Sequence, residues 1–196
     1  GSATHSVSTT AEQRARSMPT IMTHAAVPLA LWCASERGRI SPRLLAAGVV
    51  AAMLPDADVA AFALHIPYAD AFGHRGASHS LLFAMLTAAL GAGAHRLLRA
   101  DALQAAGFLL ICTASHPLLD AMTSGGLGVA LAWPWSDARW FAPWRPIRVS
   151  PFAGNFFNTR GLTVLLSELR WVWLPLTVAA LGWRCLQRAT PQDHAS

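Results

Sequence analysis

Histidine and aspartate side chains stand at the ends of apolar stretches of this 196-residue chain, in the order His24, Asp56, Asp58, His116 and Asp120. Imidazole and carboxylate groups are typical ligands of Zn²⁺, and carboxylates also suit Mn²⁺ and Mg²⁺. His116 and Asp120 are four residues apart, so on a helix both would occupy one face and could hold one cation. The alternative is that His116 bonds locally and Asp120 begins a turn. The pattern favours a divalent-metal site.

Asp56 and Asp58 are two residues apart and so would not share a helix face. Pro55 precedes them, and we expect the chain to turn there, which would let both carboxylates face one site. The alternative is a helix terminus with aspartate as its cap. We expect Asp56 to bind the metal. Asp58 is a candidate general base, bridging ligand or orienting group for a ligand.

The densest polar segment is Gly73-His74-Arg75-Gly76-Ala77-Ser78-His79-Ser80. Its glycines allow a tight loop, and we expect Ser78 to cap the helix that follows. His79 is then a metal ligand, and His74 is a catalytic residue or a further ligand. Arg75 is a planar cation that suits phosphate or carboxylate. The alternative is that His74 and Arg75 are ordinary loop residues. Isolated histidines, at positions 5, 65, 95 and 194, are not expected to be ligands.

The composition points to a membrane protein. Hydrophobic residues make up 54% of the chain and charged residues 13%, against about 25% charged in an average soluble domain. This excludes a disordered chain and argues against an ordinary soluble enzyme. The net charge is +5, but the arginines are scattered between apolar runs, so nucleic acid is not an expected partner. The three cysteines lie within apolar segments and are expected to be small buried hydrophobes.

The periodicity predicts an all-α fold, a multi-pass membrane bundle of about five helices with an irregular Trp- and Pro-rich loop over 124–160. The apolar runs cover 25–34, 44–54, 80–94, 102–119 and 162–186. Residues 162–186 are the best candidate span, and 80–98 the next. One membrane-embedded domain is expected over 18–188, with a tail at 189–196. Residues 1–17 are expected to be a disordered tail or a cloning remnant.

If the chain crosses the membrane at each run in alternating directions, all the His and Asp positions come to one side. Metal sites in helical bundles are built in this way from facing helices. Each side carries seven arginines: positions 14, 16, 75, 139, 145, 148 and 160 on the side of the site, and positions 37, 39, 43, 96, 99, 184 and 188 on the other. Only loop length separates the two sides, because the second set lies in short loops and the tail close to helix ends. Positive charge in short loops favours the cytoplasm, so we expect the site to face the periplasm.

The ordered motifs resemble a known family. They are Met22-Thr23-His24, Leu54-Pro55-Asp56-Ala57-Asp58, the segment from His74 to Ser80, and Ser115-His116-Pro117-Leu118-Leu119-Asp120-Ala121-Met122-Thr123. Over about residues 18–150 the chain is similar to the YdjM-type, LexA-binding, inner-membrane-associated metal-dependent hydrolases. The resemblance implies a multi-pass protein of the bacterial inner membrane that hydrolyses its substrate with a metal ion.

A weaker likeness extends to zinc-dependent phospholipases C and single-strand-specific zinc nucleases. Those enzymes are all-helical and hold several zinc ions with His and Asp clusters. They also use an N-terminal tryptophan ligand that has no counterpart in this chain, so we expect one or two ions rather than three.

Together these observations predict a membrane-embedded enzyme that hydrolyses a phosphoester bond with metal-activated water. The expected substrate is a lipid. The ion is expected to be zinc, with manganese or magnesium as alternatives, and its ligands to be His24, Asp56, His79, His116 and Asp120. The Trp-rich loop would hold the lipid at the membrane surface. Three alternatives stay open: a metal or proton transporter with a His/Asp relay, a regulatory or binding protein, and a bundle stabilised by a structural metal.

Overall fold

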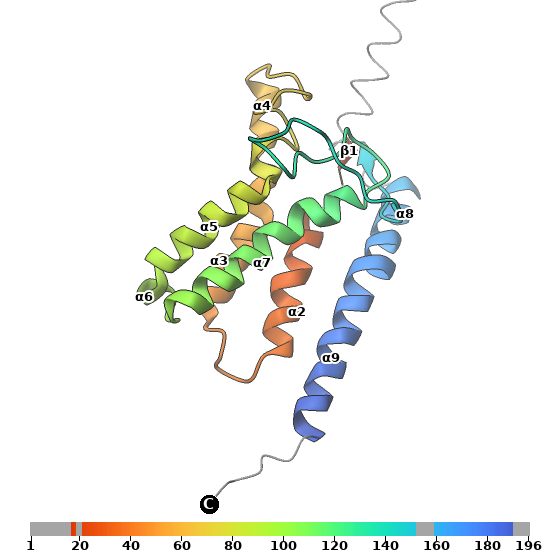
Figure 1. Cartoon of the computed structure of the whole chain (residues 1–196). Helices are drawn as coiled ribbons and strands as arrows, with labels where there is room; N and C mark the ends of the chain where they lie inside the picture. The colour runs from red at the N-terminus through yellow and green to blue at the C-terminus, as the bar shows by residue number, and fades with distance from the viewer. Residues whose placement is uncertain (1–16, 19–20, 152–158, 190–196) are drawn as a thin grey trace, which may run out of the picture.

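The computed structural model describes residues 17–18, 21–151 and 159–189, and its regular structure is almost wholly helical (Figure 1). In order, the helices are η1 Ile21–Ala25, α2 Ala26–Ala34, α3 Pro42–Met53, η2 Leu54–Val59, α4 Ala60–Ala63, η3 Ala77–His79, α5 Leu81–Gly93, α6 His95–Leu98, α7 Ala102–Ala121, α8 Thr159–Glu168, η4 Leu169–Trp173 and α9 Leu174–Ala189. Elements η1 to η3 are 3₁₀-helices and η4 is a π-helix. Two-residue strands, β1 Ser17–Met18 and β2 Ser150–Pro151, pair antiparallel. The prediction of an all-α membrane bundle is confirmed.

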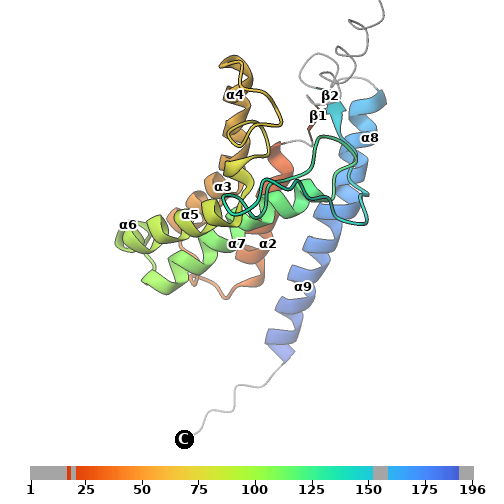
Figure 2. The same ribbon diagram turned by 45° about the horizontal axis from the view of Figure 1, so that its top comes forward.

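The helices pack in the order α5, α7, α3, α2 and α9, each against the next (Figures 1 and 2). The core between α3 and α7 is built largely of alanine, leucine and one cysteine, with Leu44, Ala52 and Cys112 fully buried. Gly48 of α3 lets α7 approach closely, because a Cβ atom there would lie 2.3 Å from Cε1 of Phe108. Small residues such as Gly48 and Ala52 therefore mark the face of α3 that packs against α7.

Polar caps set where the long helices begin. The Ser41 side chain accepts a hydrogen bond from the Leu44 amide at the start of α3, and Asp101 accepts one from Gln104 at the start of α7. Such caps satisfy amide groups that have no partner within the helix. At α5 the cap is Ser80, which accepts from the Phe83 amide at 3.1 Å. The prediction that Ser78 caps this helix was wrong, because Ser78 lies inside η3 and bonds elsewhere.

Within the described ranges, three helical segments are long and apolar enough to cross a membrane, at 42–63, 102–121 and 161–189. The last agrees with the span predicted at 162–186. The span predicted at 80–98 is wrong, because α5 ends at Gly93 after 13 residues. Thirteen residues rise about 20 Å, short of the ~30 Å hydrocarbon core. The helix formed by η1 and α2 is also under spanning length, so not every apolar run crosses as we expected.

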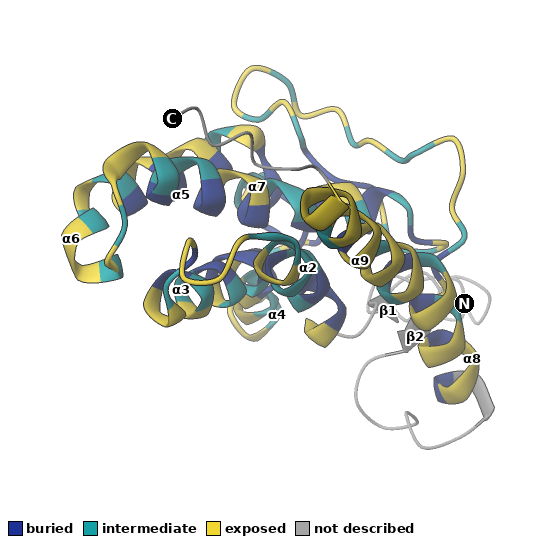
Figure 3. Ribbon diagram, turned by 90° about the horizontal axis from the view of Figure 1, so that it is seen from below, coloured by how far each residue is buried: buried dark blue, intermediate teal, exposed yellow. Residues whose placement is uncertain are grey.

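Exposed residues run along the outer faces of the helices (Figure 3), and many of them are large and apolar. Leu103 of α7 is 84% exposed, and Leu90 of α5 is 73% exposed. A contiguous apolar outer surface suits lipid rather than water.

The chain does not turn away at Pro55, as the sequence led us to expect. It continues helically, with Pro55 in the first turn of the 3₁₀ segment η2. This continuity gives the 42–63 segment its spanning length.

The Trp- and Pro-rich stretch is irregular where the structure describes it. Isolated bridges join Thr123 to Ile147 and Val129 to Trp140, and Val129 and Ile147 are buried. Arg139 donates hydrogen bonds to the carbonyl oxygens of three residues in the 68–74 segment. The loop is thus fastened over the polar segment before α5. The predicted tails lie outside the described residues except for Ser17 and Ala189, as do His5 and His194.

We expect Gly48→Ala to destabilise the protein, because its new methyl group would collide with the packed Phe108 ring. Overpacking of this kind costs about 1–3 kcal/mol. Gly107→Ala in α7 is the matched control: nothing lies within 4 Å of its added Cβ, and alanine is the better helix former by about 1 kcal/mol. Thermal unfolding in detergent should show a lower Tm for Gly48→Ala and an equal or higher one for Gly107→Ala. Equal losses in both would contradict the close approach of α3 and α7.

Candidate metal site

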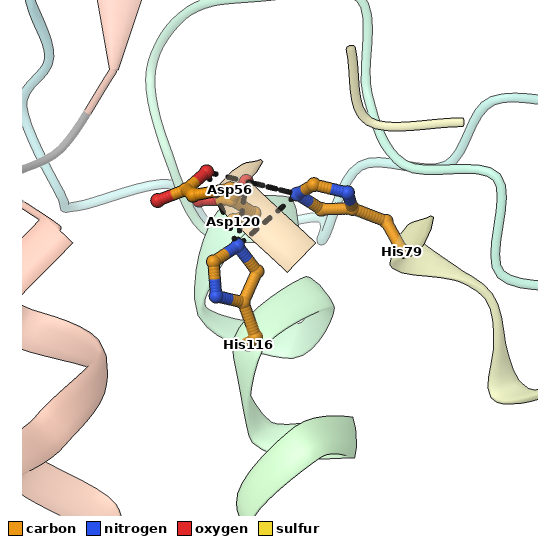
Figure 4. Close-up of side chains that lie close together, drawn as sticks. All are labelled: Asp56, His79, His116 and Asp120. Carbon is orange, nitrogen blue, oxygen red and sulfur yellow. Dashed lines mark hydrogen bonds and ion pairs between the residues drawn. The ribbon is translucent and has the colours of Figure 1, made fainter. Parts of the chain in front are cut away.

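Four buried side chains from three elements converge at one end of the bundle (Figure 4). Asp56 comes from η2, His79 from η3, and His116 and Asp120 from the last turns of α7. One ligand atom of each lies within 4.8 Å of all the others. The sequence prediction that these segments meet at one end therefore agrees with the structure.

The distances within this group of four match those between ligands of one small cation. His79 Nε2 lies 3.1 Å from His116 Nε2 and 3.3 Å from Asp120 Oδ2. Asp56 Oδ1 lies 3.4 Å from His116 Nε2 and 4.0 Å from His79 Nε2. In a tetrahedral site with metal–ligand bonds of about 2.0–2.2 Å, ligand atoms stand about 3.3–3.6 Å apart. The group can thus hold a metal ion after small adjustments.

His24 approaches the other oxygen of each of the same two carboxylates. Its Nε2 atom is 3.8 Å from Asp56 Oδ2 and 3.7 Å from Asp120 Oδ1, and its ring stacks on that of His116 with centroids 3.6 Å apart. Among the described residues, His24 Nε2, Asp56 Oδ2 and Asp120 Oδ1 are buried without a hydrogen-bond partner. Buried polar atoms are nearly always paired, so these three point to a missing cationic partner.

The outer nitrogen of each imidazole in the group of four is held by a second contact. His116 Nδ1 lies 2.7 Å from the Ala52 carbonyl oxygen, and His79 Nδ1 lies 3.1 Å from Asp58 Oδ2. When Nδ1 carries the proton in such a contact, the lone pair of Nε2 faces the metal position. The surrounding structure thus turns both rings toward the cluster.

Asp58 does not join Asp56 in the cluster. Its carboxylate contacts His74 Nδ1 at 2.5 Å, His79 Nδ1, the Ser78 hydroxyl and the Arg75 amide. In a 3₁₀-helix three residues make one turn, so side chains two positions apart point in different directions. The expectation that both carboxylates face one site is wrong for this reason.

Arg75 is fully buried and lies at ion-pair distance from the cluster, with Nε 3.0 Å from Asp120 Oδ2. Its Nη1 donates to the Thr123 hydroxyl and to the Gly125 carbonyl oxygen. Among the described residues, its Nη2 has no hydrogen-bond partner. Arg75 is therefore a buried positive charge beside the carboxylates rather than an ordinary loop residue.

His74 stands behind Asp58 and outside the group of four. Its ring is edge-on to the ring of His79, with centroids 5.7 Å apart, and it contacts the ring of Tyr68. Its Nε2 atom is buried and unpartnered within the described part of the chain. His74 thus acts on the cluster through Asp58.

Charge around His79 favours its protonated form when no cation is present. Burial alone would lower the pKa of His79 from 6.5, but hydrogen bonds to Asp120 and Asp58 outweigh this effect and raise it to about 9. A cation bound at Nε2 would compete with that proton, as metals do at imidazole ligands.

Four residues near the site had no such role in the sequence analysis. Ser78 donates to Asp58 Oδ2, Thr123 accepts from Arg75, and the Thr23 hydroxyl donates to Glu168 at 2.7 Å. The last bond ties η1, which carries His24, to the end of α8. Ser78 and Thr123 lie within the motifs quoted in the sequence analysis, and that position was the available signal for their role. Glu168 lies outside those motifs and is the acidic residue of the candidate span at 161–189.

We expect Arg75→Gln to destabilise the metal-free protein strongly, because Asp120 would keep a buried charge without its partner. Breaking a buried ion pair in this way costs about 3–5 kcal/mol. The exposed Arg96 provides the control, since Arg96→Gln should change stability by less than about 0.5 kcal/mol. Unfolding in detergent with a chelator present checks both variants, and equal stability of the two would refute the ion pair.

Comparison with known proteins supports a family assignment. The chain is 48% identical over 171 residues to the protein named inner membrane protein YbcI of Escherichia coli (strain K12), a match that covers 85% of this chain and 99% of that protein. No solved structure matches this chain. The weaker likeness to phospholipases C is not supported by these comparisons. The YdjM inner membrane protein family matches residues 18–190, so this chain is a member of that family and an inner membrane protein.

Proposed function

We propose that this protein is a metal-dependent hydrolase of the inner membrane that cleaves a phosphoester bond of a lipid. The observation that carries the proposal is that Asp56 and Asp120 each face three imidazoles, those of His24, His79 and His116. Each carboxylate offers one oxygen to His79 and His116 and the other to His24.

The arrangement supports two metal positions bridged by the same carboxylates. Asp56 Oδ1, Asp120 Oδ2, His79 and His116 would hold a first ion, and Asp56 Oδ2, Asp120 Oδ1 and His24 could hold a second. The second position has three protein ligands. Sites that keep a coordination position open are catalytic rather than structural, which favours an enzyme over a bundle stabilised by a metal. Zinc suits this mixed nitrogen and oxygen set, with manganese as the alternative.

A bound divalent cation would supply Lewis acidity, which lowers the pKa of water and polarises an ester oxygen. The other roles in the reaction, orienting the ligands and stabilising charge, would fall to the protein's own residues. Asp58 orients His79 rather than acting as the base, because its oxygens are already engaged by four partners. The buried guanidinium of Arg75, 3.0 Å from Asp120 Oδ2, places positive charge beside the carboxylates, and its field would stabilise negative charge that develops on the substrate.

The charge of the site favours an anionic substrate. Asp56, Asp58 and Asp120 oppose one guanidinium group, that of Arg75. With neutral imidazoles, three carboxylates against one guanidinium leave a net charge of −2, which one divalent ion would cancel. A second ion would make the site positive, as binding of a phosphoryl group requires. The arginines in short loops and at the C-terminal end of α9 lie away from the site, and by the positive-inside rule we propose that the site faces the periplasm.

An apolar cavity of about 320 Å³ beside the site favours a lipid. Phe72, Leu82, Phe83 and Trp133 contribute to its wall, and Trp133 belongs to the Trp-rich loop. Ser78 lines this cavity and also donates to Asp58, so the cavity shares a wall with the polar site. An acyl chain of the substrate fits there.

Metal content is the decisive measurement. We expect two divalent ions per wild-type chain purified from metal-replete medium, one in His24→Gln, and fewer than one in Asp120→Asn, which weakens both positions. His95→Gln is the control, because His95 bonds to the Ala100 carbonyl oxygen away from the site. Elemental analysis counts the ions. Release of phosphorylated headgroup from phospholipid vesicles, stopped by chelator and restored by zinc, then tests the reaction.

A wild-type chain free of divalent metal would refute the site itself. Bound metal without hydrolysis, together with zinc flux into proteoliposomes, would replace the hydrolase with a transporter.

The apolar cavity is tested by filling it. Leu86 lines the cavity, whereas Leu90 lies one turn further along α5 and outside it. We expect Leu86→Trp to raise KM for long-chain lipid substrates by about tenfold, the equivalent of ~1.4 kcal/mol of lost binding, with little change for short chains. Leu90→Trp should behave as wild type. Equal KM values for both variants at all chain lengths would exclude the cavity as the acyl site.

A further inference from the structure

A second cavity lies at the opposite end of the bundle from the metal site. Its volume is about 440 Å³, and it is formed by the end of α2, the loop that follows it, and the last turns of α9. Because α2 begins beside His24 and ends at Ala34, the length of this helix separates the cavity from the metal site (Figure 1).

Positive charge predominates around this cavity. Three arginines, Arg37, Arg184 and Arg188, and one acidic residue, Glu36, are among the residues that line it. Arg184 and Arg188 are four residues apart on α9, so they share a face and repel each other. Within the described part of the chain, no ion pair joins Glu36 to any of the three arginines. This excess of positive charge therefore favours an anionic ligand in the cavity.

The three arginines differ in whether their guanidinium groups make hydrogen bonds within the protein. Arg184 Nη1 donates to the carbonyl oxygens of Cys33 and Ser35, which fastens α9 to the end of α2. Arg37 and Arg188 are exposed, and among the described residues no hydrogen bond or ion pair engages their guanidinium groups. Both are free to bind a phosphate, which the planar guanidinium fork matches in shape.

Part of the cavity wall is apolar, and this favours a lipid over a soluble anion as the ligand. Trp32 and Leu181 line it, and Leu181 continues the exposed apolar surface of Val178 and Leu174 along the outer face of α9. A free phosphate would leave this wall in contact with water. A phospholipid would place its phosphate among the arginines and lay its chains along α9.

We propose that this cavity binds the phosphate group of an anionic phospholipid from the membrane leaflet at this end. Basic pockets between membrane helices are known to hold such headgroups. The bound lipid would join α2 to α9 and neutralise arginines that otherwise repel one another. This site is independent of the metal site and of the proposed hydrolysis.

The test is binding of lipid to the delipidated full chain in detergent, followed by native mass spectrometry and thermal shift. We expect dioleoyl phosphatidylglycerol to bind at least tenfold more tightly than dioleoyl phosphatidylcholine. The double variant Arg37→Gln/Arg188→Gln should remove this preference. The control Arg39→Gln/Arg96→Gln removes the same charge outside the cavity lining and should keep the preference.

Loss of the preference in both double variants, or in neither, would overturn the proposal, since the attraction would then be diffuse or would lie elsewhere. Inorganic phosphate provides the second arm. Binding of phosphate alone that depends on Arg37 and Arg188, without binding of phosphatidylglycerol, would also overturn it in favour of a soluble anion. If the double variant does not fold, Arg37→Gln alone, in an exposed loop, should weaken phosphatidylglycerol binding severalfold, and an unchanged affinity would count against the cavity.

Discussion

The buried carboxylates of Asp56 and Asp120 are the constraint on which the rest of the site depends. An ionised group in a low-dielectric interior is costly unless it is paired, and both groups are almost completely buried. Arg75 lies at ion-pair distance from Asp120, and three imidazoles stand within 4.0 Å of one or both carboxylates. These neighbours still leave carboxylate oxygens without a hydrogen-bond partner among the described residues. A cation between the carboxylates is the simplest remaining way to balance them.

The backbone departs from regular α-helix where these groups enter the site. His24, Asp56 and His79 lie in the short 3₁₀ segments η1, η2 and η3, and His116 immediately precedes Pro117 within α7. Irregular backbone at membrane depth is tolerated where it is buried in protein or lines a polar cavity. The tight turns direct neighbouring side chains apart, so that Asp56 faces the cluster while Asp58 supports it from behind.

The two ends of the bundle carry different chemistry. One end gathers buried imidazoles and carboxylates under an irregular loop that Arg139 fastens in place. The other end carries exposed arginines around the contact of α2 with α9, where Arg184 bonds across the two helices. The apolar faces between the ends suit the hydrocarbon of the bilayer. Because the buried ionisable groups are confined to one end, the arrangement resembles an enzyme set into one face of a membrane. A transporter requires polar groups along the whole length of its path.

The sequence alone determined the all-helical membrane class and the residues that could meet. Apolar runs and the caps between them are local signals, and the placement of His and Asp at run ends brought His24, Asp56, His79, His116 and Asp120 to one side of a bundle. Only the tertiary structure decided that Asp58 and His74 stand behind the cluster, that Arg75 pairs with Asp120, and that Ser80 rather than Ser78 caps α5. It also showed that α5 is too short to cross. These outcomes depend on how segments distant in sequence pack and on where a 3₁₀ turn rotates a side chain, which neither composition nor spacing encodes locally.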